Sequence, residues 1–133
     1  MGTDGDILHL VFEPKRDCAR LARKAVLETF PAVTARDTLE LVVSELVTNA
    51  YLHGDGDIEM AISQRDNTVC VVVSSHVSDP EVTLTAESAH LDSNAETENG
   101  RGLALVERLS HSWDYTVTGS RLSVSAIVTG LYQ

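Results

Sequence analysis

Apolar residues recur at a helical spacing in the stretch LELVVSELVTNAYLHGDG, residues 39–56. The apolar positions are Leu39, Val42, Val43, Leu46, Val47 and Ala50. Steps of three and four residues are typical of one face of an amphipathic helix. The pattern therefore predicts a long central helix, with Thr34 or Asp37 as its N-terminal cap and Gly54 as a left-handed C-terminal cap.

Shorter patterns predict the elements around this helix. Pro14 fits the first position of a helix that Phe30-Pro31 ends, and Gly119-Ser120 is typical of a two-residue hairpin turn. The predicted strands cover residues 7–12, 57–64, 68–75, 113–118 and 121–129. The other predicted helices cover residues 14–29 and 103–110. The run of valines in 68–75 indicates a strand in the middle of the sheet.

Strands and helices do not alternate singly along the chain, which argues against a doubly wound parallel sheet. The order predicts an α/β two-layer sandwich of the α+β type, with a mostly antiparallel mixed sheet covered on one face by three helices. We expect residues 1–133 to form a single domain. Residues 77–99 have no sustained period and predict a lid or binding loop, with room for a short helix over 85–91.

Charge and composition narrow the possible partners. The formal net charge is −10, and residues 31–133 hold five basic against fifteen acidic side chains. Such a body disfavours duplex nucleic acid and suits a basic protein partner. A basic face with Arg16, Arg20 and Lys24 is either a solvated surface or a docking patch.

No stretch predicts a membrane span or signal peptide, and two distant cysteines indicate reduced thiols, so we expect a cytoplasmic protein.

Three polar residues stand one helical turn apart at the margin of the central helix's apolar face. They are Glu45, Asn49 and His53. Burying them without hydrogen-bond partners would cost about 1–3 kcal/mol each. We therefore expect them either to face solvent or to line a site whose ligand pairs with them. In a site, Asn49 has an oxygen for Mg²⁺ and Glu45 is a possible general base.

A second motif lies between the predicted loop and the third helix. Gly100-Arg101-Gly102 would place backbone N–H groups at a helix start, where an anion such as phosphate is a natural ligand. A Gly-x-Gly turn alone is weak evidence, and its value comes from the pairing with Glu45 and Asn49.

Together the two motifs resemble those of a known family. The run ELVTNAYLHG from Glu45 to Gly54 resembles the N-box of the GHKL (Bergerat-fold) ATP-binding proteins, and NGRGLALV from Asn99 to Val106 is similar to their glycine-rich lid box. The nearest variant is the actinobacterial type of anti-sigma-factor serine-protein kinase. The likeness covers about residues 10–130.

This resemblance implies a Bergerat fold with ATP between the central helix, the lid and the third helix. It implies that Asn49 binds Mg²⁺ through the nucleotide, that Glu45 acts as a catalytic base, and that His53, Gly100, Arg101 and Gly102 lie in the nucleotide site. It further implies a homodimer that sequesters a sigma factor, is countered by a STAS-domain anti-anti-sigma antagonist, and phosphorylates that antagonist on serine.

One position departs from the family pattern. The family has an aspartate at the end of the strand after the N-box hairpin, where its carboxylate accepts from the adenine amino group, and here that position is Ser75. Asp79 lies four residues later and would need a loop shift to replace it. A hydrogen bond to a charged group is worth about 1.5–3 kcal/mol, or roughly one to two decades of affinity. We therefore expect an anti-sigma factor in which ATP binding and serine kinase activity are weakened or lost.

The alternatives are a fully active ATP-dependent serine kinase and an orphan GHKL regulator or sensor-kinase-like ATPase module. A sensor-kinase module would follow a phosphoacceptor helix pair, for which we expect no room before residue 7. A metal site at His53, Asp55 and Asp57 is a weaker hypothesis, because this spacing is typical of a polar turn. For His9, His90 and His111 we expect structural or surface roles.

Overall fold

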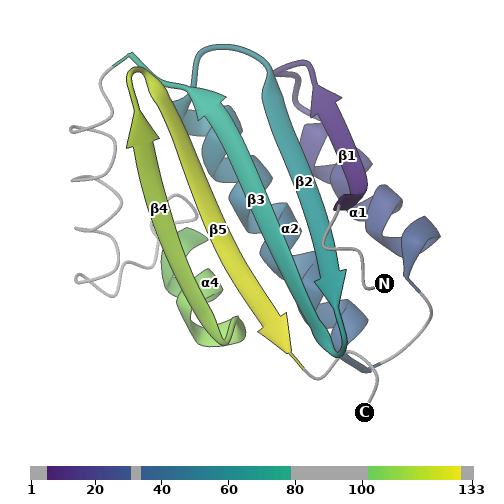
Figure 1. The fold of residues 1–133 in the computed structure, drawn as a ribbon. Helices are drawn as coiled ribbons and strands as arrows, with labels where there is room; N and C mark the ends of the chain where they lie inside the picture. The colour runs from purple at the N-terminus through teal and green to yellow at the C-terminus, as the bar shows by residue number, and fades with distance from the viewer. Residues whose placement is uncertain (1–5, 31–33, 79–101, 130–133) are drawn as a thin grey trace.

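Five strands form a single antiparallel sheet in the computed structural model, which describes residues 6–30, 34–78 and 102–129 (Figure 1). The strands follow one another across the sheet in the order β1-β2-β3-β5-β4. Their bounds are β1 Asp6–Phe12, β2 Ile58–Arg65, β3 Thr68–His76, β4 Ser112–Thr118 and β5 Arg121–Thr129. All four strand pairings within the described residues are antiparallel, so the expected sheet is confirmed without a parallel pair.

The described helices all lie on one face of the sheet (Figure 1). They are α1 Cys18–Thr29, α2 Thr34–His53 and α4 Gly102–Leu109. Helix α2 packs against α1 on one flank and against α4 on the other. This arrangement confirms the predicted α+β architecture of three helices over one sheet face.

The core lies between α2 and the middle strand β3. On β3 the odd-numbered residues Val69, Val71 and Val73 face the helices and are buried. On α2 the buried positions are Leu39, Val42, Val43, Leu46 and Val47. These are five of the six apolar positions that predicted the helix, and Ala50 packs beside them as a partly buried residue. The run of valines therefore marks the central strand, as predicted.

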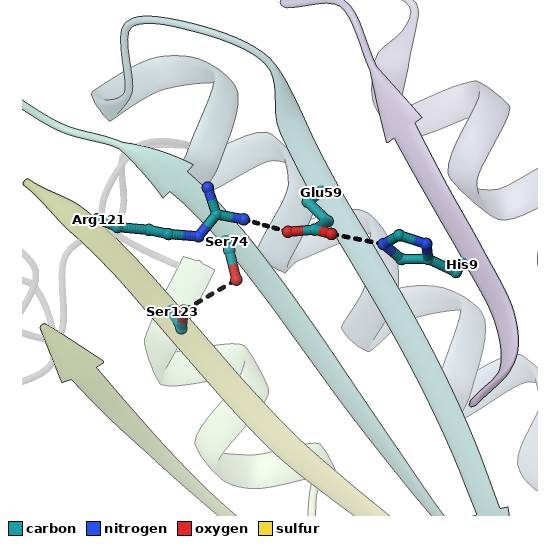
Figure 2. A network of polar contacts seen from close by, with 5 residues as sticks. All are labelled: His9, Glu59, Ser74, Arg121 and Ser123. Atoms are coloured by element: carbon teal, nitrogen blue, oxygen red, sulfur yellow. Dashed lines mark hydrogen bonds and ion pairs between the residues drawn. The ribbon is translucent and has the colours of Figure 1, made fainter. Parts of the chain in front are cut away.

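The other face of the sheet carries a polar network that spans several strands (Figure 2). Glu59 on β2 accepts from Arg121 on β5 and pairs with His9 Nε2 on β1 at 2.5 Å. Beside it the hydroxyls of Ser74 and Ser123 are 2.8 Å apart. These charged groups are exposed, so we assign the network little net stability. The expected surface role of His9 is confirmed.

Two helix starts differ from the sequence predictions. Helix α1 begins at Cys18 rather than at Pro14, because residues 13–18 form turns in which Lys15 N donates to Glu13 O and Cys18 N donates to Lys15 O. Helix α2 already includes Thr34, so Asp37 lies in its first turn and does not cap it. Pro14 therefore marks the approach to the helix, not its first position.

Both cysteines are free thiols, as expected. Cys18 is buried at the start of α1, and this burial raises the pKa of its thiol. Cys70 on β3 is half-buried. None of the described helices is long and apolar enough to cross a membrane.

Gly54 follows α2 for a different reason from the one predicted. Its φ lies outside the left-handed range, so it is not a left-handed cap. A Cβ at this position would lie 2.6 Å from Ala50 O and 3.1 Å from both His76 O and Ser75 Oγ. Glycine is required here chiefly because a Cβ would overlap Ala50 O of α2 itself, and the end of β3 adds two further close contacts.

We predict that Gly54→Ala lowers the free energy of unfolding by about 1–3 kcal/mol, since the added methyl group overlaps fixed backbone oxygens. Urea titration followed by circular dichroism measures the loss. Gly56→Ala is the matched control, because the nearest atom to its Cβ would be His76 Cβ at 4.0 Å. Equal stability of the two variants would show that α2 and β3 do not approach as closely as described.

Candidate functional site

Glu45, Asn49 and His53 occupy one flank of α2. The opposite flank faces α1, where Arg23 Nη1 donates to Ser44 Oγ at 2.9 Å. Residues four apart on a helix shift by only about 40° per step, so the three polar residues remain on the flank turned away from Ser44. Helices α1 and α4 lie on opposite sides of α2 (Figure 1), so this flank is the one on the α4 side. All three side chains are partly buried, which is the margin position predicted from the sequence.

The Asn49 amide is buried without compensation. Its Nδ2 atom is buried and has no hydrogen-bond partner among the residues that the structure describes. An unsatisfied buried amide costs about 1–3 kcal/mol, so such a group in a folded protein calls for an explanation. A ligand that binds the amide supplies one. The amide oxygen also fits the hard oxygen ligands that Mg²⁺ prefers, beside phosphate and water.

Ser75 lies against the same end of α2. It is on the helix-facing side of β3 and only 3% exposed, and its Oγ is the atom that approaches Gly54. Gly54 is the last residue of the 45–54 motif, and Ser75 is the position that departs from the family pattern. The two residues lie next to each other. Two segments about twenty residues apart in the sequence therefore meet at one point.

Gly102 is the first residue of α4, and the helix that it begins packs against α2. The second motif thus leads directly into the helix that packs against α2. Gly100 and Arg101 lie outside the described residues, as do residues 79–99 of the predicted loop and the short helix expected over 85–91. Of that loop, Val77 is buried and its N–H donates to Ser120 O at 2.8 Å.

Sequence reasoning missed a polar cluster at the edge of this region. The Asp55 carboxylate accepts from Ser78 Oγ at 2.6 Å and pairs with His76 Nδ1, while Asp55 N donates to His76 O at 3.0 Å. The Ser78 and His76 contacts lower the pKa of the Asp55 carboxyl. The cluster joins positions 21–23 residues apart, which no local pattern signals.

The rival metal site at His53, Asp55 and Asp57 is not assembled. Asp55 turns to His76 and Ser78 instead. Within the described ranges no group of three or more His, Cys, Asp or Glu side chains is placed to hold a metal ion.

A family model describes nearly all of this arrangement. The model of the histidine kinase-like ATPase domain matches residues 16–127, from the approach to α1 into β5. The chain belongs to the histidine kinase-like ATPase domain family. A search of the curated proteins found no match.

Membership in this family gives the two motifs a common setting. Histidine kinase-like ATPase domains are nucleotide-handling modules, and the residues that the resemblance assigned to a nucleotide lie within the matched range. In this domain Glu45 and Asn49 share the flank of α2 that faces α4, and Ser75 lies at the end of that helix.

We predict that Asn49→Leu raises the free energy of unfolding by about 1–3 kcal/mol in the absence of ligand, because it removes a buried unsatisfied amide. The same change removes the amide from the site and abolishes Mg-nucleotide binding. Thermal unfolding and calorimetry measure the two effects. A loss of stability comparable to that of a core truncation would instead show that the amide has protein partners.

We predict a pH-dependent contribution from Asp55. A carboxyl whose folded-state pKa is depressed stabilises the fold above its unfolded-state value, here 3.8, and loses that effect as the pH falls through the folded-state pKa. Asp55→Asn should therefore be less stable than wild type at pH 6, and the difference should shrink as the pH falls below 3.8 through the lowered folded-state pKa. Asp57→Asn is the control, and parallel pH curves for wild type and Asp55→Asn would contradict the assignment.

Proposed function

We propose that this chain is an anti-sigma factor that sequesters an RNA polymerase sigma factor and is countered by a STAS-domain anti-anti-sigma antagonist. The support comes from the family match over residues 16–127 together with the N-box-like and lid-box-like motifs, which resemble those of anti-sigma-factor serine kinases. We further propose a cytoplasmic homodimer, as in that group.

In this proposal nucleotide binding is weakened. The single observation that carries it is the neutral, buried Ser75 where the family pattern has a carboxylate. Losing a charge-assisted hydrogen bond to the base reduces affinity by roughly one to two decades. Partner binding needs no intact base contact, so it survives the change.

A fully active serine kinase is the second candidate, and the Glu45–Asn49 flank favours it. Asn49 would help to hold Mg²⁺, which when bound neutralises charge on the transferred phosphate. Glu45 would accept the proton of the attacking serine hydroxyl. Both side chains lie on the flank against α4, where such roles require them.

Tagged protein should capture a sigma factor and a STAS-domain protein from the native cytoplasm, and each should then bind the purified chain directly. Calorimetry with Mg-ATP should give an affinity weaker than low micromolar. Incubation with labelled ATP and the captured STAS protein decides between the candidates. Rapid stoichiometric serine phosphorylation would select the active kinase, whereas recovery of neither partner would overturn the anti-sigma proposal.

A further inference from the structure

The surroundings of Ser75 are electrically neutral. Its strand partners are Ile58 on β2 and Leu122 on β5, and both are buried. Its buried neighbours along the chain are Val73 on β3 and Val77, which directly follows the strand. Across from it lies the backbone of Gly54, which has no side chain to cover the hydroxyl. The Ser75 hydroxyl is thus a polar group in an otherwise apolar patch at the end of α2.

No described carboxylate substitutes for the missing charge at this point. Asp55 is the nearest in the fold, but its two oxygens are engaged by His76 and Ser78. His76 follows Ser75 on the strand and so points to the opposite sheet face. Glu45 precedes Gly54 by nine residues, which is about 13 Å along a helix. None of these described carboxylates therefore replaces the aspartate of the family pattern, and the side chain present at that position is the Ser75 hydroxyl.

A serine hydroxyl differs from a carboxylate in what it can pair with. The hydroxyl both donates and accepts, whereas an ionised carboxylate only accepts. Position 6 of adenine is an amino donor, and position 6 of guanine is an oxo acceptor. An acceptor-only group selects the amino purine and repels the oxo purine, but a hydroxyl rotates to suit either.

We propose that this site takes purine nucleoside triphosphates with little discrimination between 6-amino and 6-oxo bases. The inference rests on the nucleotide site of the proposed function and deepens it. Ser75 is the specificity-determining residue: its neutral hydroxyl lowers the affinity for ATP and at the same time admits nucleotides that an aspartate would exclude.

Titration calorimetry of the full chain with Mg-ATP, Mg-GTP and Mg-ITP tests this proposal. ITP carries the 6-oxo group without the 2-amino group of GTP, so the ATP-to-ITP comparison leaves position 2 unchanged and alters only position 6 and the adjoining N1, which becomes an N–H donor. We expect the wild-type dissociation constants for ATP and ITP to agree within about three-fold. Ser75→Asp should bind ATP at least ten-fold more tightly than ITP, as loss of one charge-assisted hydrogen bond requires. Ser75→Ala is the matched control, which weakens both nucleotides equally.

A wild-type preference for ATP above ten-fold would overturn the inference. If Asp79→Asn then removed that preference, the base acceptor would be Asp79, which lies outside the described residues. Binding of no nucleotide by wild type, with ATP binding restored in Ser75→Asp, would also overturn the inference and leave the anti-sigma proposal intact.

Failure to capture sigma and STAS partners would overturn the anti-sigma proposal without affecting the nucleotide comparison. Because the wild-type ATP-to-ITP ratio is decisive alone, the test does not depend on how well Ser75→Asp folds.

Discussion

The packing of α2 against β3 is the constraint on which the rest of this structure depends. The valine row of β3 and the apolar face of α2 form the centre of the core, and both are almost fully buried. At the end of these elements Gly54 lies against β3, where an added Cβ would be 3.1 Å from both His76 O and Ser75 Oγ. The candidate site lies on these same two elements. Its geometry is therefore fixed by core packing rather than by the polar residues themselves.

The two faces of the sheet carry different kinds of polar chemistry. On the helix side, Asn49 and Ser75 are largely withdrawn from water, where a ligand's hydrogen bonds are worth most. On the open side, His9, Glu59 and Arg121 form an exposed network across the strands (Figure 2). Exposed ion pairs contribute little to stability, but charges on an edge strand such as β1 oppose unwanted strand pairing. We therefore place the functional chemistry on the helix side.

Most of the fold could be predicted from the sequence because its signals are local. The spacing from Leu39 to Ala50 gives α2, the valine run gives the central strand, and Gly119 gives a turn that the structure realises with a φ of 62°. The errors arose where a residue has two possible roles. Gly54 has the chemistry of a left-handed cap, but glycine is needed there because a Cβ would overlap Ala50 O of the same helix and crowd the end of β3. Pro14 similarly fits a helix start as well as the preceding turn.

In the candidate site, too, the features set by local sequence could be predicted, and those set by tertiary contacts could not. Glu45, Asn49 and His53 share a flank because helix geometry requires it, and the sequence therefore predicts them correctly as a group. The approach of Ser75 to Gly54 and the contacts of Asp55 with His76 and Ser78 depend on how β3 meets α2, for which no short pattern exists. Ser75 drew attention only because a family pattern has an aspartate there.

Asn49 and Ser75 differ in what their burial costs, and so in whether each needs a ligand. Asn49 Nδ2 is buried without a hydrogen-bond partner among the described residues, and a ligand that binds the amide would compensate that burial. Ser75 needs no such compensation, since a hydroxyl costs less to bury than a carboxylate. In the proposed nucleotide site, the end near Asn49 therefore holds a group that is costly to bury without a ligand, while the end near Ser75 holds a neutral group where the family pattern has a charge. That combination is expected of a site in which nucleotide binding persists but the choice of base is relaxed.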